Sequence, residues 1–442
     1  MAEKTIKVGL VGFGTVGAGV AKILLEQTDA IAARLGIRLQ LACVVDLDTE
    51  SKRPVDLPPG ILTDDLNKLL SDESIAIAVE LVGGTGVAKD MQIAMLKAGK
   101  DVVTANKALL AEHGLELYRV ANDNQRCIAF EASCAGGIPI VSAIRTGLAA
   151  NNIEAMYGIV NGTCNYILTN MSRLGWDFDE ALTQAQAKGY AEADPTLDIN
   201  GGDSAHKMAI LGSMAFGYEL SLDDVLAEGI EGISKDDIRY GAEMGYCLKL
   251  LAIGQKSPEG RVSLRVHPSF IDADSALARV DGSFNAVSLF GNAVGQVMFY
   301  GRGAGMMPTA SAVVADIIEV ALGNSAQTFR HMQLQPRTQI EHLIAAPEQL
   351  ISRFYIRLQV EDHPGVIATL GRVLAEHQIS ISGVLQHEGC DSDNCVPLVI
   401  VTHGTPEKNM TAALKQMTAL DVTSGVPVCI RIVDIPSDEE SE

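Results

Sequence analysis

The first 27 residues contain the feature that most restricts the fold of this chain. The segment TIKVGLVGFGTVGAGVAKILLEQ has the pattern of a buried strand, a glycine turn and an amphipathic helix. Gly12 permits a tight turn, Gly14 lets the backbone approach a pyrophosphate, and Gly17 lets helix and strand pack closely. The predicted phosphate-binding segment, which ends at a helix N-terminus, consists of Gly12, Phe13, Gly14, Thr15, Val16 and Gly17.

A second predicted strand, LQLACVVD, ends at Asp46, where an acid can bind the adenosine ribose. Asp46 lies further from Gly17 than the usual interval of about 20 residues. We expect LEQTDAIAARLGIR to form a lengthened helix and loop that absorbs the excess. Asp46 favours NAD, whereas Lys52 and Arg53 could neutralise the additional phosphate of NADP, so both cofactors remain open.

Two further strand-like runs, IAIAVELVGG and KDVVTANK, flank the helix-like segment AKDMQIAMLKAG. This alternation predicts a parallel, doubly wound α/β sheet. Thr104 and Lys107 follow the carboxyl end of a strand, which is the edge where such sheets bind ligands. Taken alone, Lys107 is more simply interpreted as a surface lysine.

Two glycine-containing segments follow. FEASCAGGIPIV could turn backbone carbonyls toward a monovalent cation, with Glu131 adding charge, although a structural hinge between domains is the simpler interpretation. GIVNGTCNYILTNM has the pattern of another strand, turn and helix. Its Asn161, Gly162 and Thr163 could present backbone N–H groups to a substrate carboxylate.

The segment DPTLDINGGDSAHKMAIL places a lysine on an apolar helical face. Its two adjacent glycines allow Asp203 to lie near a helix N-terminus, one turn before Lys207. Lys207 shares its face with Ile210, Leu211 and Met214, so we expect it to be partly buried. Burial favours the neutral amine and nearby carboxylates favour the ammonium.

Such an ammonium can donate a proton to a carbonyl oxygen as hydride reaches the carbon. Glu192, Asp198 and Asp203 supply more negative charge than one lysine needs, which suits a substrate that carries an ammonium group. A structural ion pair in a capped helix explains the same residues equally well.

These segments together resemble the homoserine dehydrogenases of the long, bacterial type. The resemblance rests on pieces in family order between about residues 6 and 320, namely GLVGFGTVGAGV, VVTANKALL, FEASCAGGIPI, GIVNGTCNYILTNM, KGYAEADPTLDINGGDSAHKMAIL and GRGAGMMPTASAVVADI. It implies reversible, NAD(P)H-dependent reduction of L-aspartate 4-semialdehyde to L-homoserine in threonine and methionine biosynthesis. The alternatives are an oxidoreductase acting on another amino-acid semialdehyde and a non-catalytic amino-acid sensor.

The resemblance also implies roles for individual residues. Lys207 matches the proton donor, and Lys107 matches a second proton-transfer group beside the nicotinamide. The implied substrate pocket comprises Glu192, Asp203, Asp198, Tyr190, Gly162 and Thr163. The implied structural Na⁺ site comprises Glu131 and, through backbone carbonyls, Cys134, Gly136 and Ile138, which replaces the hinge interpretation. The implied cofactor contacts beyond the glycine turn are Asp46, Thr104, Lys107, Gly303 and Gly305.

Two departures from the family pattern concern single residues. Val45 stands where many relatives have an arginine for the 2′-phosphate, which weakens the case for strict NADP use. Cys164 replaces a common threonine, a change for which we expect little consequence beyond tuning of the pocket.

The last 90 residues show a different pattern. RFYIRLQV alternates apolar and polar residues, and the order strand–helix–strand–strand–helix–strand is ferredoxin-like. This part resembles an ACT domain, which implies binding of an amino-acid effector, with L-threonine the obvious candidate, or a role in dimerisation alone. His363, His387 and His403 are isolated and are predicted to be surface or interface residues rather than metal ligands.

We therefore predict an α/β protein with a Rossmann-type doubly wound nucleotide domain, an α+β catalytic and dimerisation domain, and a C-terminal ferredoxin-like (βαββαβ) ACT domain. The predicted boundaries are 1–135, completed by a returning helix near 308–323, then 136–305, a linker 324–352, 353–435, and an acidic tail 436–442.

Charge and composition restrict the partners. A net charge of −21 argues against nucleic acid and anionic membranes, which favour basic surfaces. No long apolar run and no signal-peptide core are present, so we expect a cytoplasmic protein with eight reduced cysteines, Cys390 and Cys395 being the only close pair. We expect a homodimer or homotetramer.

Overall fold

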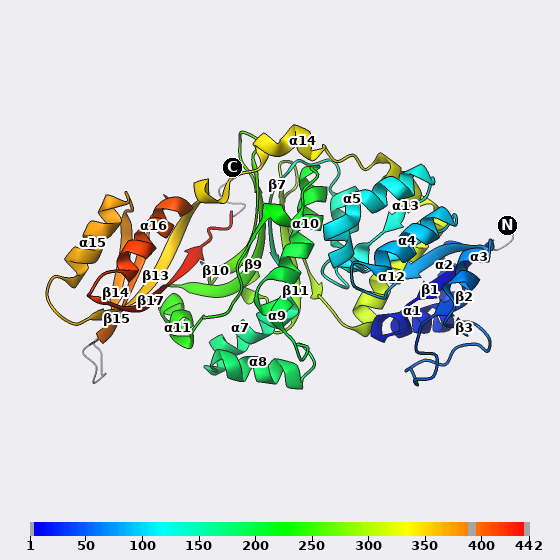
Figure 1. The fold of residues 1–442 in the computed structure, drawn as a ribbon, viewed down its shortest axis with the longest axis horizontal. Helices are drawn as coiled ribbons and strands as arrows, with labels where there is room; N and C mark the ends of the chain where they lie inside the picture. Colours follow the sequence, from blue (N-terminus) through cyan, green and yellow to red (C-terminus); the bar gives the residue numbers. More distant parts are fainter. Residues whose placement is uncertain (1–3, 388–394, 437–442) are drawn as a thin grey trace. The chain divides into compact units, whose positions relative to one another are not determined.

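The computed structural model describes residues 4–387 and 395–436 (Figure 1). The chain divides into two compact units. Unit 1 comprises Met1–Glu154, Ala205–Val225 and Phe284–Glu341, and unit 2 comprises Ala155–Ser204, Leu226–Ser283 and His342–Glu442. The predicted middle domain, 136–305, is thus divided between the units. Cys390 and residues 437–442 of the predicted acidic tail lie outside the described residues.

Unit 1 is built on a parallel six-stranded sheet in the order β3-β2-β1-β4-β5-β6, which confirms the doubly wound prediction. Val8 and Leu10 in its central strand are fully buried, as expected for a parallel sheet covered on both faces. The strands are β1 (Lys4–Val11), β2 (Ile37–Val45), β3 (Leu62–Thr63), β4 (Ile75–Glu80), β5 (Asp101–Thr104) and β6 (Ile128–Ala129).

Each helix around this sheet follows a strand in the chain, except α2, which follows α1. They are α1 (Thr15–Glu26), α2 (Thr28–Leu35), α3 (Leu66–Ser71), α4 (Val87–Lys97) and α5 (Lys107–Asp123). The additional residues before Asp46 differ from the prediction, because they form a separate helix α2 rather than an extension of α1. Gln27 leaves the helical conformation between the two, and the Thr28 hydroxyl donates to the Leu39 carbonyl at 2.9 Å, which ties α2 to β2.

The remainder of unit 1 returns from distant parts of the chain. Helix α12 packs against α1, where a Cβ added to Gly19 would lie 2.9 Å from the Ala310 Cβ. The elements are η1 (Glu131–Ser133), α6 (Ile140–Ser142), the π-helix η2 (Ala143–Gly147), η3 (Leu222–Asp224), β11 (Phe284–Gly291), β12 (Gly295–Arg302), α12 (Met306–Leu322), α13 (Asn324–His331) and α14 (Arg337–Ile340). The short helix η5 (Glu341–Leu343) begins in unit 1 and ends in unit 2. Helix α10 (Gly202–Phe216) begins in unit 2 and continues into unit 1.

Unit 2 contains a mixed sheet in the order β7-β9-β10-β17-β13-β15-β14. The strands and helices before its C-terminal part are β7 (Ile153–Ile159), α7 (Gly162–Leu174), α8 (Phe178–Ala187), α9 (Thr196–Ile199), β8 (Val225–Ala227), α11 (Lys235–Glu243), β9 (Tyr246–Lys256), β10 (Val262–Asp272), η4 (Leu277–Arg279) and η6 (Pro347–Gln349). Strand β8 pairs with β10.

The C-terminal part of unit 2 has the predicted βαββαβ order. Its elements are β13 (Ile351–Glu361), α15 (Val366–Glu376), β14 (Ile381–Gln386), β15 (Cys395–Thr402), β16 (Thr405–Pro406), α16 (Glu407–Thr418) and β17 (Thr423–Ile432). Phe354, Ile356, Leu358 and Val360 point into its core as the alternation predicted. Tyr355 is also fully buried, because this end of β13 is covered on its other face by residues of α11.

Within the residues described, no single helix is both long and apolar enough to cross a membrane, although the bent pair α12–α13 meets the length and composition criteria when combined.

Candidate functional site

The glycine turn of unit 1 is shaped to receive a phosphate group. Gly12 has a φ of +95°, which L side chains rarely adopt, and a Cβ at position 17 would lie 2.0 Å from the Gly12 carbonyl oxygen. A Cβ added to Gly14 would instead meet nothing within 4 Å. The turn is therefore tight on its protein side and open at Gly14, at the N-terminus of α1, which fits a dinucleotide pyrophosphate.

The end of β2 holds the same turn. The Asp46 carboxylate accepts a hydrogen bond from the Phe13 N–H at 2.5 Å, and Arg53 Nε donates to the Phe13 carbonyl at 2.8 Å. A second guanidinium nitrogen of Arg53 lies 3.1 Å from Asp48. The acidic Asp46 and the basic Arg53 thus both bind the backbone of Phe13 in the turn. Lys52, in contrast, is exposed.

A buried polar network supports the edge of the sheet at Thr104. The Thr104 hydroxyl donates to Glu80 at 2.9 Å, and the other Glu80 oxygen accepts from the N–H groups of Val82 and Gly83. Asn106 caps α5 and donates to the Gly84 carbonyl at 2.7 Å. Thr104 therefore shapes the loop through its hydroxyl, and Lys107 is the half-buried first residue of α5.

Sequence reasoning did not single out Glu80 or Asn106. The available signal for Glu80 was a glutamate at the end of an apolar strand, three residues before the glycine pair Gly83-Gly84, since a charge there needs several donors.

The segment after β6 presents backbone oxygens rather than a cluster of acids. The Glu131 carboxylate accepts from the N–H groups of Val141 and Ser142, both at 2.8 Å, so it caps α6. Burial raises the pKa of Glu131, and these hydrogen bonds oppose that shift. Ala135 and Gly136 both have positive φ values, which curl the chain here. In the described part of the chain no three His, Cys, Asp or Glu side chains form a metal-binding group.

The later glycine loop contacts this segment. A Cβ added to Gly136 would lie 2.3 Å from the Gly303 carbonyl oxygen, and one added to Gly303 would lie 2.0 Å from Asn285. Gly305 has a φ of +125° and directly precedes α12. The predicted cation segment and the Gly303–Gly305 loop are therefore neighbours within unit 1.

Two predicted substrate carboxylates come together in unit 2. Asn161 Nδ2 donates to Asp198 Oδ1 at 2.7 Å and to Asp203 Oδ2 at 2.8 Å, while its Oδ1 accepts from the Cys164 N–H at the start of α7. The Cys164 thiol lies 3.2 Å from the Asp198 carbonyl, so the residue that departs from the family pattern contacts this group directly. Asn161 was predicted only through its backbone, and its side chain is the centre of the arrangement.

The other predicted substrate residues lie at the edge of this group. The Thr163 hydroxyl donates to the Tyr190 carbonyl at 2.7 Å, and Gly162 is the first residue of α7. Tyr190 is 44% exposed, with its ring 4.8 Å from that of Tyr166. Glu192 is exposed, and the described contacts of this residue involve its backbone carbonyl rather than its carboxylate.

Lys207 lies on α10, one helical turn after Asp203, and is only 8% exposed. Ile210 and Leu211 are buried as predicted, whereas Met214 is half-buried. Burial raises the pKa of the Cys134 thiol to about 12, and the positive charges of Lys207 and Lys107 oppose this rise. The two predicted catalytic lysines therefore both lie near Cys134 in unit 1.

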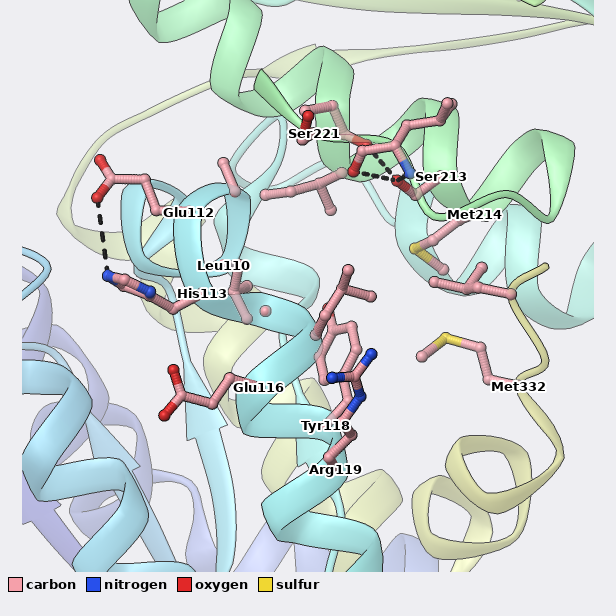
Figure 2. Close-up of a pocket in the computed structure, with 17 residues that line it drawn as sticks. Leu110, Glu112, His113, Glu116, Tyr118, Arg119, Ser213, Met214, Ser221 and Met332 are labelled. Atoms are coloured by element: carbon pink, nitrogen blue, oxygen red, sulfur yellow. Dashed lines mark hydrogen bonds and ion pairs between the residues drawn. The ribbon is translucent and has the colours of Figure 1, made fainter. Parts of the chain in front are cut away.

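A separate pocket of about 310 Å³ lies between α5, α10 and the segment after α13 (Figure 2). Met214 and Met332 lie on one side, with Glu112, His113 and Arg119 projecting from α5. None of the residues predicted for the substrate, cofactor or cation lines this pocket, so it carries no part of the functional assignment.

Comparison with known proteins adds three family matches. Residues 139–318 match the profile described as homoserine dehydrogenase, residues 12–131 match its NAD binding domain, and residues 354–422 match the ACT domain.

Individual relatives match over nearly the whole chain. A homoserine dehydrogenase of Neisseria gonorrhoeae is 40% identical over 432 residues, which covers 97% of this chain and 99% of the relative. One from Synechocystis is 41% identical over 436 residues, covering 97% and 100%.

Two solved structures are also similar. The crystal structure of a homoserine dehydrogenase from Thiobacillus denitrificans has a TM-score of 0.88 at 40% identity and covers 98% of this chain and 99% of that one. A hyperthermophilic archaeal homoserine dehydrogenase mutant in complex with NADPH has a TM-score of 0.61 at 28% identity and covers 72% and 98%.

Proposed function

The chain belongs to the homoserine dehydrogenase family, and on that premise we propose that Lys207 is its proton donor and that Asp198 and Asp203 bind its substrate. The activity is reversible, NAD(P)H-dependent reduction of L-aspartate 4-semialdehyde to L-homoserine. The observation that carries the residue assignment is the Asn161 amide, which holds two carboxylates together at the start of the helix that bears Lys207.

Each residue then has a defined task. The Asp198 and Asp203 carboxylates hold the substrate ammonium, and the N–H groups of Gly162 and Thr163 at the start of α7 hold its carboxylate. The nicotinamide, when bound, exchanges a hydride with the substrate carbon. Lys207 Nζ donates a proton to the aldehyde oxygen, so that no alkoxide charge accumulates, and takes the proton back in the oxidation. Lys107, at the N-terminus of α5, is the second proton-transfer group.

The basic test is an assay with purified protein. Homoserine with NAD or NADP should increase absorbance at the reduced-nicotinamide band, and the reverse reaction with aspartate semialdehyde should decrease it. A homologous amino-acid semialdehyde, longer by one methylene, is the control substrate. Faster turnover of that analogue would favour the alternative oxidoreductase, and no turnover of any substrate would favour the sensor.

Arg53 is the residue that we propose for the 2′-phosphate of NADP, because the Phe13 carbonyl and Asp48 hold its guanidinium beside the glycine turn. Arg53→Ala should raise KM for NADP by about 10- to 100-fold, the value of one hydrogen bond between charged groups, and should change KM for NAD much less. The control is Lys52→Ala, which removes an exposed neighbouring charge. An equal rise in KM for NADP and NAD would refute a role specific to the 2′-phosphate.

We also propose that the segment around Gly136 binds Na⁺. Carbonyl oxygens suit this hard ion, and the curled backbone at Ala135 and Gly136 is consistent with such a site. The Glu131 carboxylate, which is already held by two N–H groups, would add charge rather than most of the ligands. The backbone carbonyls of Cys134, Gly136 and Ile138 would hold the ion and fix the Gly303 loop.

Sodium should accordingly stabilise the protein. At a concentration of about 100 times Kd, a ligand that binds only the folded state adds about 2.7 kcal/mol to the free energy of unfolding. Tm should therefore rise and saturate with NaCl, but not with choline chloride at the same ionic strength. If Tm depends on concentration in the same way for both salts, the proposed Na⁺ site is refuted.

For the C-terminal ACT domain we propose an amino-acid effector, with L-threonine as the first candidate, and a cytoplasmic homodimer or homotetramer as the active form. Initial rates with and without threonine test the effector. If threonine does not change the rates, and if the mass of the oligomer in solution falls when the ACT domain is removed, the domain serves dimerisation alone.

A further inference from the structure

The ACT domain is joined to the rest of unit 2 by a short strand contact. Strand β17 pairs with β10 in parallel at two positions, Ser269 with Arg431 and Phe270 with Ile432. Beside this contact lies a cavity of about 450 Å³, lined by residues of both parts, among them Gly229, Pro268 and Ile430. Two backbone pairs next to a cavity make a weak connection, so side chains must contribute to it.

Arg431 is the side chain that bridges the connection. It is 8% exposed, and its guanidinium binds both oxygens of Glu228, at 2.7 and 2.8 Å. It also binds Glu407, the first residue of α16, at 2.6 and 3.0 Å. Burial opposes the charged form, but the hydrogen bonds with Glu228 and Glu407 raise the pKa of Arg431 above its ordinary value. One cation therefore serves two carboxylates, one from each part.

Glu228 belongs to a segment that lies directly against the turn between Asp198 and Asp203. The Ile230 N–H donates to the Ile199 carbonyl at 2.8 Å. A Cβ added to Gly229 would lie 2.0 Å from that same carbonyl oxygen, and one added to Gly201 would lie 2.9 Å from the Glu228 carbonyl oxygen. The backbone of residues 228–230 thus contacts the backbone of the 199–201 turn at both Ile199 and Gly201. A shift of Glu228 must therefore move this turn or break these contacts.

We propose that Glu228 is a positioning residue for the substrate carboxylates, and that its pairing with Arg431 makes their position depend on the ACT domain. Glu228 holds the 199–201 turn, the turn sets the spacing of Asp198 and Asp203, and Asn161 binds both. This inference rests on the proposed function, because it takes these two carboxylates to be the site of the substrate ammonium.

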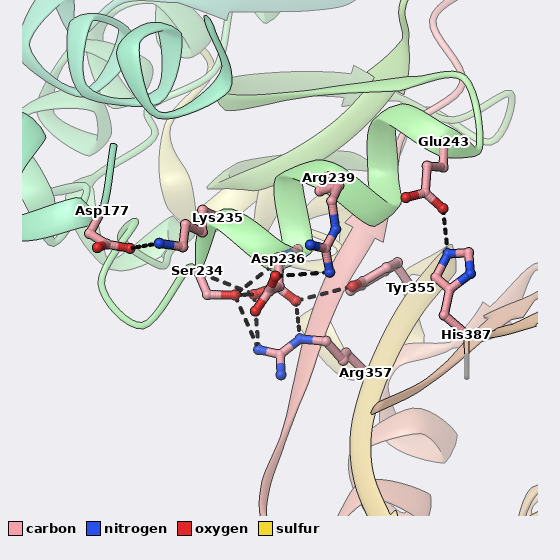
Figure 3. A network of polar contacts seen from close by, with 10 residues as sticks. Asp177, Ser234, Lys235, Asp236, Arg239, Glu243, Tyr355, Arg357 and His387 are labelled. Atoms are coloured by element: carbon pink, nitrogen blue, oxygen red, sulfur yellow. Dashed lines mark hydrogen bonds and ion pairs between the residues drawn. The ribbon is translucent and has the colours of Figure 1, made fainter. Parts of the chain in front are cut away.

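A second buried ion pair provides a matched control. Asp237 of α11 is fully buried and binds Arg357 of β13 at 2.6 and 3.1 Å, with the Tyr355 hydroxyl at 3.1 Å. Figure 3 shows Arg357 and Tyr355 directed toward the start of α11. This pair also ties the ACT domain to the rest of unit 2. Helix α11, however, carries none of the proposed substrate residues. Removing the Asp237–Arg357 ion pair therefore tests the attachment of the ACT domain without directly disturbing the 199–201 turn.

The experiment compares Glu228→Gln with Asp237→Asn in steady-state kinetics and thermal unfolding of the full-length protein. Glu228→Gln should raise KM for homoserine roughly 2- to 30-fold, the range over which packed networks modulate coupling, and leave KM for the nucleotide unchanged. Asp237→Asn should lower Tm at least as much without raising KM for homoserine. Arg431→Lys should act like Glu228→Gln, because a lysine cannot bind both oxygens of Glu228 in parallel.

The KM for homoserine of the double variant, Glu228→Gln with Arg431→Lys, tests whether the two residues act together. If Glu228 and Arg431 act as one unit, the rise in KM in the double variant should be no larger than in the more affected single variant. An unchanged KM in Glu228→Gln, or an equal rise in Asp237→Asn, would overturn the inference. Wild-type protein without homoserine turnover would instead contradict the proposed function, so the two failures are distinguishable.

Discussion

Replacing Lys207 by alanine is expected to lower kcat for homoserine oxidation by about 10²–10⁴-fold, the usual contribution of a positioned acid. The side chain is nearly buried on α10, outside the glycine turn that we propose for the nucleotide. The dissociation constant for NADPH should therefore stay near the wild-type value. Stopped-flow measurement of hydride transfer and fluorescence titration of the nucleotide separate these two effects.

The control for this variant is a second buried lysine. Lys249 on β9 is 2% exposed, and its Nζ donates to the Val280 carbonyl at 2.7 Å. Burial lowers the pKa of Lys249, as it would for any lysine so enclosed. Lys249→Met should reduce Tm and leave kcat of the folded enzyme nearly unchanged. Wild-type turnover in Lys207→Ala would show that another group delivers the proton.

Replacing Asn161 by aspartate is expected to reduce kcat/KM for homoserine by about 10²–10⁴-fold at pH 8, since two hydrogen bonds to charged groups are lost. The aspartate keeps the acceptor that caps α7 but cannot donate to Asp198 or Asp203. Three carboxylates then share one site. The change should appear mainly in KM, because the role that we propose for these residues is to bind the substrate rather than to transfer its proton.

This variant should also acquire a pH dependence of known sign. Mutual repulsion raises the pKa of at least one of the three carboxyl groups above its ordinary value. Below that pKa the shared proton restores a donor between the carboxylates, and above it the donor is lost. The ratio of variant to wild-type kcat/KM should therefore fall as pH rises through this pKa.

Asn170→Asp makes the same replacement on the same helix and serves as the control. Its amide donates to the Tyr166 carbonyl, away from the two aspartates. The Asn170 variant should show no such dependence on pH. A pH-independent ratio for Asn161→Asp would indicate that its side chain does not organise the substrate site.

Several features were predictable because they depend on neighbours in the sequence. The glycine turn, the start of α7 at Gly162 and the position of Lys207 one turn after Asp203 follow from backbone sterics and helical periodicity. The βαββαβ order of the ACT domain followed from alternation within single strands.

Other features depend on residues that are far apart in the chain. Asn161 contacts Asp198 and Asp203 from 37 and 42 positions away, and Arg431 contacts Glu228 across 203 positions. The sequence indicated only a backbone N–H group at Asn161, and nothing near Glu228 in the sequence indicates its partner. Thr104 was predicted to follow a strand and is instead the last residue of β5, where its hydroxyl donates to the buried Glu80.

The amino-acid sequence by itself determined which local shapes form and which chemical groups are present, since a turn or a helical face depends on residues within about one turn of each other. Only the tertiary structure decided which amide lies between the two carboxylates and which arginine joins the ACT domain to Glu228. The physical reason is that a buried polar group must find a partner, and the fold, not the spacing along the chain, sets which partners lie within hydrogen-bonding distance.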